Sequence, residues 1–224
     1  MTSSSSPPPR SPVFPLTLAF LSLCLFLGLA ISVHAGWTHR FDEAGLLAFR
    51  RAGDPSNPMG PGWLQASGRD FTALGSNGVV GALVLATARL LALARQRGSS
   101  LFLLAAFAGA LALQGVAKLV VGRPRPELLP HAARVFTTSF PSSHATVSAA
   151  IALAGAVLLA RAGPDRRFAA VAGLIAVCLA ALVGLSRLYL GVHWPTDVLA
   201  GWALGVSWGA ACWTGLRRWS GPVT

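Results

Sequence analysis

The sequence is poor in acidic residues and in charge of any kind. Of its 224 residues only 7 are Asp or Glu and 11% are charged, while 54% are hydrophobic. A soluble domain of this length exposes far more charge, so we expect a chain that is inserted in a membrane. The few carboxylates form no acidic cluster that would hold magnesium, which predicts a site without a metal ion or another cofactor.

Cysteine and lysine are scarce as well. Cys24, Cys178 and Cys212 all lie in apolar runs, at spacings typical of neither a zinc site nor a disulfide framework. Lys118 is the only lysine, and the net charge is +11. In a soluble protein this charge would suggest nucleic acid. In a membrane chain it indicates basic cytoplasmic loops or an anionic ligand, so we expect no nucleic-acid partner.

Long apolar runs are what the sequence has in abundance. They predict an all-α, polytopic membrane protein with about six transmembrane helices in a bundle. The predicted spans are residues 13–33, 78–93, 101–121, 145–160, 168–185 and 198–216. The first run could instead be a signal peptide cleaved near Ala35, but its length favours an uncleaved span.

Residues 1–12 read as a disordered leader, and residues 13–224 as a single membrane-embedded domain. A short helix is expected after the first span, either in the membrane interface or as an ordinary surface helix. Its predicted apolar face consists of Phe41, Ala44, Leu47 and Ala48. Gly and Pro break the chain over residues 53–62, and Asp70 is expected to cap the helix that follows.

Arginines in the short loops predict the orientation in the membrane. Those on one side of the predicted bundle are Arg10, Arg89, Arg95, Arg97, Arg161, Arg166, Arg167, Arg217 and Arg218. The positive-inside rule makes that side cytoplasmic, together with both termini. Two loops on the opposite side, residues 118–144 and 186–197, also carry basic residues and therefore break the rule. An anionic ligand is the explanation that we expect.

Three cations open the first of these loops. Lys118 lies at the end of an apolar run, and Arg123 and Arg125 follow shortly after it. A single lysine in that position could simply reach the headgroup region. Three cations this close repel one another unless an anion lies between them.

The same loop ends where the next apolar helix begins. Ser142 or Ser143 can cap that helix, and His144 lies in its first turn. Capping is one explanation for the serines. The free N–H groups at such a helix start also attract an anion, which is the other.

The second loop, SRLYLGVHWPTD, carries Arg187, His193 and Asp197. Arginine can donate two hydrogen bonds to a phosphate, and histidine can attack phosphorus or carry a proton near neutral pH. Pro195 favours a helix start, so Asp197 can hold the ring nitrogen of a histidine four residues earlier. Taken alone, these residues could equally be a basic flank and a helix cap. The three clusters together indicate a phosphate site.

Together these residues resemble the type 2 phosphatidic acid phosphatase superfamily, which also includes vanadium haloperoxidases. The family pattern is K-x6-R-P, then P-S-G-H, then S-R-x5-H-x3-D. The matching residues are Lys118, Arg125 and Pro126, then Pro141, Ser142 and His144, then Ser186, Arg187, His193 and Asp197. Ser143 replaces the family glycine, and its hydroxyl could either crowd a phosphate or add a hydrogen-bond donor.

The resemblance implies a metal-independent phosphatase. His193 would be the nucleophile that forms a phosphohistidine, and Asp197 would orient it. His144 would protonate the leaving oxygen and then activate water. The residues that would hold the phosphoryl oxygens are Lys118, Arg125, Ser142, Ser143 and Arg187.

The resemblance also implies a lipid phosphate or diphosphate as substrate. Phosphatidic acid, phosphatidylglycerophosphate and undecaprenyl diphosphate are candidates, met on the extracytoplasmic side of a bacterial inner membrane. A lipid phosphotransferase using the same phosphohistidine remains an alternative, as does a non-catalytic lipid-phosphate binder or transporter. A haloperoxidase fits less well, because the known kind is soluble. The sequence leaves the oligomeric state open.

Overall fold

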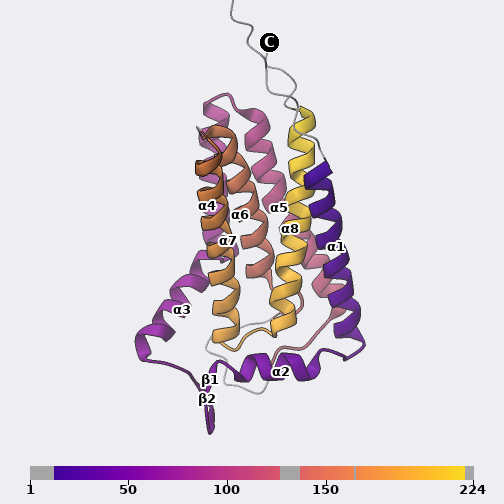
Figure 1. The fold of residues 1–224 in the computed structure, drawn as a ribbon, viewed down its shortest axis with the longest axis vertical. Helices are drawn as coiled ribbons and strands as arrows, with labels where there is room; N and C mark the ends of the chain where they lie inside the picture. The colour runs from indigo at the N-terminus through magenta and orange to yellow at the C-terminus, as the bar shows by residue number, and fades with distance from the viewer. Residues whose placement is uncertain (1–12, 127–136, 164, 220–224) are drawn as a thin grey trace, which may run out of the picture.

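The computed structural model describes residues 13–126, 137–163 and 165–219, with side chains as far as Arg217. Six long helices run side by side in a bundle (Figure 1). They are α1 (Val13–His34), α4 (Asn77–Leu93), α5 (Arg97–Val121), α6 (Ser143–Ala162), α7 (Arg166–Tyr189) and α8 (Pro195–Trp219). The predicted all-α membrane fold is confirmed. The leader over residues 1–12, including Arg10, lies outside the described residues.

Helix α6 is the centre of the bundle. It packs against α5, α7 and α8, and α1 covers the other side of α8. Small residues allow α6 and α8 to approach closely. A Cβ atom on Gly205 would lie 2.2 Å from the backbone oxygen of Thr146, and one on Gly201 would lie 2.8 Å from that of Ser142. This approach fixes the start of α6 beside the start of α8.

Four helices, α1, α5, α6 and α7, are long and apolar enough to cross a membrane by themselves. Helix α3 (Gly62–Leu74) and α4 pass the same test together, with a bend of 47° between them, and would make a fifth span. Large apolar side chains such as Leu119 and Val120 are exposed on the outer surface. A bilayer would cover them, as expected for spanning helices.

Short elements gather at one end of the bundle (Figure 1). Helix α2 (His39–Leu47) is followed by a two-stranded antiparallel hairpin of β1 (Arg50–Arg51) and β2 (Asp54–Pro58), and then by α3. The hairpin overlaps residues 53–62, where glycine and proline were predicted to interrupt helical structure.

The predicted helix over this segment is present as α2, and its apolar face is exposed on the protein, as expected for a helix in the membrane interface or on the surface. The side of α2 that packs on the protein carries a carboxylate, which was not predicted. Phe41 and Leu47 are exposed, whereas Asp42 and Leu46 are fully buried. Asp42 turns inward because Arg123 and Thr196 lie there to bond with it. Hydrophobic periodicity cannot detect such a polar partner from a distant part of the chain.

The cap of α4 was predicted wrongly. Asp70 lies inside α3, and the N-cap of α4 is Ser76, whose Oγ accepts a hydrogen bond from the N–H of Val79 at 3.3 Å. The chain bends at Gly75, where a Cβ atom would lie 2.2 Å from Val183. Close packing against α7 therefore places the break after Leu74.

The two ends of the bundle carry different connections, as Figure 1 shows. We call "basic end" the one with the α4–α5 and α6–α7 connections, where Arg95, Arg97, Arg161, Arg166 and Arg167 lie. The "site end" is the opposite one, with α2 and the α7–α8 loop. The predicted grouping of arginine-rich loops on one side thus agrees with the fold. The side chain of Arg218 is outside the described residues.

Candidate active site

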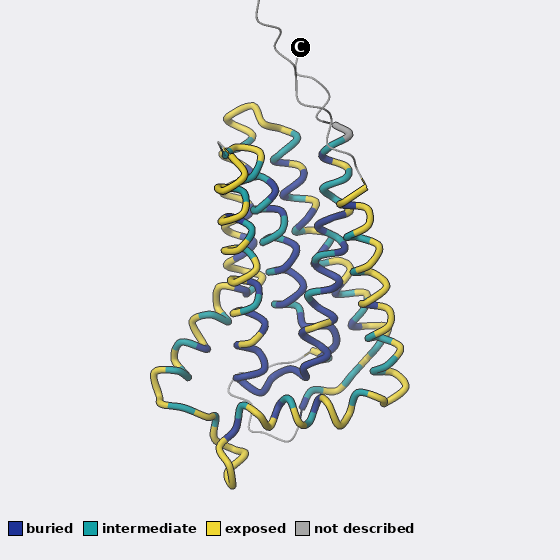
Figure 2. Tube along the Cα trace, in the orientation of Figure 1, coloured by how far each residue is buried: buried dark blue, intermediate teal, exposed yellow. Residues whose placement is uncertain are grey.

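The predicted site residues meet at the site end. The last turn of α7, the loop after it and the first turn of α8 form a continuous buried stretch, dark blue in Figure 2. The start of α6 lies beside it, since the N–H of Ser142 donates to the backbone oxygen of Asp197 at 2.9 Å. Three distant motifs are therefore joined at one place.

His193 and Asp197 face each other. The Nδ1 of His193 lies 3.4 Å from Oδ2 of Asp197, and both side chains are buried, with 2% and 0% exposure. The same Oδ2 accepts the backbone N–H of Trp194 at 2.9 Å, which holds the carboxylate at the start of α8. Pro195 begins α8 as predicted, and the helical turn brings the carboxylate under the ring.

The contacts of His193 define its tautomer. Its Nε2 lies 3.1 Å from Nη1 of Arg125, and a guanidinium can only donate, so Nε2 is the acceptor. The ring proton then resides on Nδ1, facing Asp197. Burial, followed by the charges of Arg187, Arg125 and Lys118, lowers the pKa of His193 well below its usual value. A neutral ring that carries an electron pair and no proton on Nε2 is suited to nucleophilic attack when Arg125 turns from Nε2 to a phosphate.

Three cations, which we call the cation triad, lie within electrostatic reach of this ring: Lys118, Arg125 and Arg187. Lys118 donates to the backbone oxygen of Thr138 at 2.6 Å, and Arg125 donates to that of Val192 at 2.6 Å. Within the described ranges, no ion pair joins the triad to a carboxylate. Because buried cations without a counter-ion are costly, an anion between them would be stabilising.

Lys118 is turned into the protein. It is 9% exposed, although Leu119 and Val120 beside it are exposed to the surroundings. A lysine that reached out toward headgroups would be open to solvent. Its inward position instead agrees with the alternative that it belongs to an anion site.

Arg187 is the most deeply buried member of the triad, at 3% exposure. Its Nη1 donates to Oγ1 of Thr72 at 3.2 Å, and its buried Nε has no partner among the described residues. Thr72 also shares a 2.7 Å hydrogen bond with Ser186. Helix α3 thus holds the arginine, which leaves Nε available to a ligand.

The first turn of α6 contributes Ser142, Ser143 and His144. The Oγ of Ser142 is buried and has no partner within the described part of the chain. His144 lies within electrostatic reach of His193 and the cation triad. Ser143 differs from both, because its hydroxyl donates to Oε1 of Gln114 at 2.7 Å. That bond directs the Ser143 side chain to α5, and it leaves the start of α6 to its backbone N–H groups.

A buried network that the sequence did not reveal supports Asp197. Arg123 donates from Nη1 to Oδ1 of Asp197 at 2.8 Å and from Nη2 to Oδ2 of Asp42 at 2.6 Å. Asp42 also accepts the N–H of Thr196 at 2.9 Å. We call Arg123, Asp42, Thr196 and Asp197 the Arg123 network. It ties α2, the α5–α6 loop and α8 together beneath the histidine.

The role of Arg123 therefore differs from the expected one. The sequence grouped it with Lys118 and Arg125 as a cation in need of an anionic ligand, but two carboxylates of the chain already neutralise it. Asp42 lies 81 residues away, so neither spacing nor periodicity could pair the two. Thr72 was missed for the same reason.

No group of three or more metal-binding side chains occurs among the described residues. Absence of a metal requirement stays a prediction, to be tested with a chelator. The chemistry that the site residues themselves offer is phosphate binding by cations and nucleophilic attack by an imidazole.

Comparison with known proteins identifies the family. A family model described as the PAP2 superfamily matches residues 99–220. The chain belongs to the PAP2 superfamily. The resemblance seen in the three motifs is thereby confirmed, and the chain is a PAP2-type lipid phosphatase in a membrane.

Two relatives and one solved structure illustrate the similarity. An undecaprenyl-diphosphatase of Sulfolobus acidocaldarius is 37% identical over 127 residues, 54% of this chain but only 57% of that relative. Phosphatidylglycerophosphatase B of Bacillus subtilis is 31% identical over 186 residues, 81% of this chain and 86% of the relative. The crystal structure of a transmembrane PAP2-type phosphatidylglycerolphosphate phosphatase from Bacillus subtilis has a TM-score of 0.79 and 26% identity, covering 92% and 99% of the two chains.

Proposed function

We propose that the protein hydrolyses a lipid phosphate monoester or diphosphate through a phosphohistidine on His193. The observation that carries this proposal is the position of Nε2. The opposite ring nitrogen, Nδ1, faces Asp197. Nε2 lies 3.1 Å from Nη1 of Arg125, one of the residues that we expect to bind phosphate. An imidazole held in this way is oriented for in-line attack on phosphorus.

In the first step, the lone pair of Nε2 forms a bond to phosphorus and the bond from phosphorus to the leaving oxygen breaks. His144, in its protonated form, gives a proton to that oxygen. Asp197 stabilises the positive charge that develops on the ring of His193. Lys118 and Arg125 exchange their backbone acceptors for the equatorial oxygens, where charge accumulates, and Arg187 donates to these oxygens from its unpartnered Nε.

In the second step, water attacks the phosphorus of the phosphohistidine. His144 takes a proton from this water, the P–N bond breaks, and inorganic phosphate leaves. Ser142 has a buried hydroxyl without a described partner, which suits a donor to a phosphoryl oxygen. Ser143 is bonded to Gln114, so we assign it to the support of the helix start.

The proposed substrate has its phosphate at a membrane surface and its tail in lipid. The names of the two relatives, an undecaprenyl-diphosphatase and a phosphatidylglycerophosphatase, support carrier-lipid diphosphates and glycerolipid phosphates as first candidates. We infer that the site end faces the extracytoplasmic side of a bacterial inner membrane. The support is the arginine-rich loops at the opposite end, which the positive-inside rule makes cytoplasmic.

His193→Ala in detergent-purified protein tests the mechanism. We expect the release of inorganic phosphate from undecaprenyl diphosphate or phosphatidylglycerophosphate, without an added acceptor, to fall at least about a thousandfold. Rapid acid-free quenching with 32P-labelled substrate should trap label on wild type and not on the variant. Activity near wild type in His193→Ala would remove the nucleophile. Label that transfers to an added lipid but never to water would favour the phosphotransferase.

A further inference from the structure

A cavity of about 780 Å³ lies at the basic end, between α4, α5 and α6. Its volume falls in the range of about 300 to 1,000 Å³ that is typical of ligand sites. None of the active-site residues described above lines it, and the length of the bundle separates it from His193. The active site therefore does not account for this cavity.

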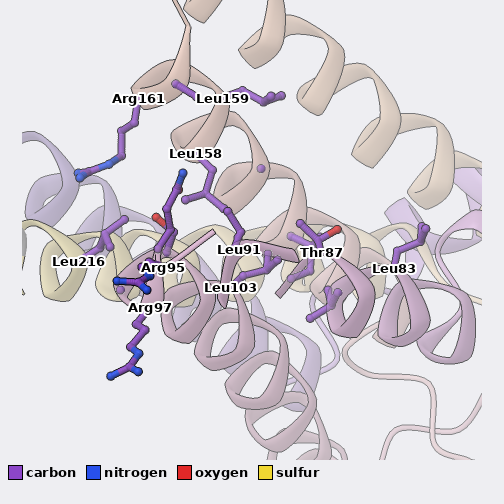
Figure 3. A pocket seen from close by; sticks show the side chains of 17 residues that line it. Leu83, Thr87, Leu91, Arg95, Arg97, Leu103, Leu158, Leu159, Arg161 and Leu216 are labelled. Atoms are coloured by element: carbon purple, nitrogen blue, oxygen red, sulfur yellow. The ribbon is translucent and has the colours of Figure 1, made fainter. Parts of the chain in front are cut away.

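The cavity has one charged end and a long apolar wall (Figure 3). Arg95, Arg97 and Arg161 lie toward one end, with their side chains directed apart, and Leu91 and Leu158 continue the wall away from them. Of the described residues that line the cavity, none is acidic. A ligand with an anionic head and an apolar tail would match both parts.

The apolar part also reaches the outer surface of the bundle. Leu83 and Leu159 line the cavity and are 61% and 48% exposed, respectively. Both lie on candidate membrane spans, Leu159 on α6 and Leu83 on α4, which passes the test together with α3. A lipid could therefore enter sideways from the bilayer, without passing through an aqueous opening.

We propose that this cavity binds one anionic phospholipid of the surrounding membrane. Its phosphate would contact Arg95 and Arg97, and one acyl chain would lie along the leucines between α4 and α6. A zwitterionic lipid would bring its ammonium group to the same arginines, which repel it. A free anion would leave the apolar wall unfilled. This second lipid site goes beyond the proposed function and does not depend on it.

The first turn of α5 adds to the attraction. Gly98 and Ser99 line the cavity there, where helical N–H groups have no partner within the helix. The positive end of the helix dipole thus lies beside the arginines. The arginines and the apolar wall carry the proposal, and the helix start strengthens it.

Native mass spectrometry of the full chain in a mild detergent tests the site. The probes are dioleoylphosphatidylglycerol, dioleoylphosphatidylcholine and the deacylated headgroup glycerophosphoglycerol. We expect one phosphatidylglycerol molecule to bind more tightly than phosphatidylcholine. Taking about fivefold in affinity for each arginine near an anionic headgroup, Arg95→Gln/Arg97→Gln should weaken it about twenty-five-fold.

Two matched controls separate the cavity from the general charge of this end. Arg166→Gln/Arg167→Gln removes the same charge from residues that do not line the cavity, and should change the affinity less than threefold. Gly155→Leu fills the apolar wall, where a Cβ atom meets nothing within 4 Å, and should weaken the lipid at least tenfold. Gly28→Leu has equally open space on α1, outside the cavity, and should leave binding unchanged.

Three results would overturn the proposal. One is equal affinity for the two phospholipids. Another is an equal loss in the two arginine double variants, which would mean general attraction by the basic loops. The third is displacement of the lipid by an equal concentration of glycerophosphoglycerol, which would mean a simple anion site. Because each readout is lipid binding, none of these results bears on phosphatase activity at His193.

Discussion

The two ends of the bundle use arginine in opposite ways. At the site end, Arg187 is buried and Arg123 is partly buried, and both are bonded to groups from other helices. At the basic end, Arg95 and Arg97 are exposed. Exposed arginines contribute little to the free energy of unfolding. The contribution of a buried arginine depends on each of its partners. The partners that the fold supplies therefore decide what an arginine does, and substitutions at the two ends should differ sharply.

The largest difference is expected in catalysis. Arg187→Gln removes a charge that we propose to face the transferring phosphoryl group, and kcat should fall about 10³-fold or more. Arg167→Gln removes the same charge at the basic end and should leave kcat within a factor of two. Phosphate release from the same lipid substrate measures both. Similar losses of kcat in the two variants would contradict the expected difference between the two ends.

The next largest effect concerns the Arg123 network. Arg123→Gln leaves Asp42 and Asp197 as buried carboxylates without their cation, which should cost about 3 to 5 kcal/mol of unfolding free energy. Equilibrium unfolding in detergent measures it, and kcat should fall with it because Asp197 loses its support. The exposed Arg51 is the matched control, since Arg51→Gln should change stability by less than about 0.5 kcal/mol. A small cost for Arg123→Gln would show that the network contributes little.

A smaller difference should appear with pH. The pKa of His193 is lowered, so between that pKa and about 6.5 the unfolded chain binds more protons than the folded one. The stability that His193 contributes is therefore complete above about pH 6.5. It is lost as pH falls toward the folded pKa, by at most about 1.4 kcal/mol per pH unit.

Thermal unfolding between pH 4.5 and 7.5 measures this dependence, with His193→Gln as the control that should reduce it. An unchanged slope in His193→Gln would assign the dependence to other groups.

The smallest effect is expected at Ser143. Ser143→Gly removes one hydrogen bond to Gln114 and restores the family residue, so stability should fall by about 1 kcal/mol. Phosphate release should stay within about threefold of wild type, because the hydroxyl faces α5. Gln114→Leu should cost about as much, since it removes the other partner. A loss of a hundredfold in Ser143→Gly alone would assign the hydroxyl to phosphate binding.

Much of the bundle could be predicted from the sequence, because a long apolar run is compatible with few structures other than a membrane-spanning helix. The predicted span 101–121 lies in α5 and the predicted 78–93 in α4, with ends within a few residues. The polar contacts of the short segments could not be predicted in the same way. Asp42 points inward and Ser76 rather than Asp70 caps α4, because their surroundings come from elsewhere in the chain.

The sequence by itself determined the family and the set of residues that can bind phosphate or attack phosphorus. Phosphoryl transfer constrains the types of these residues and their spacings along the chain. His193, Pro195 and Asp197 lie within five residues at the start of α8, so their relation is local. Only the tertiary structure decided that Arg123 serves Asp42 and Asp197, and that Ser143 bonds to Gln114. These pairings depend on which helices lie side by side, and close packing of α6 on α8 sets that arrangement.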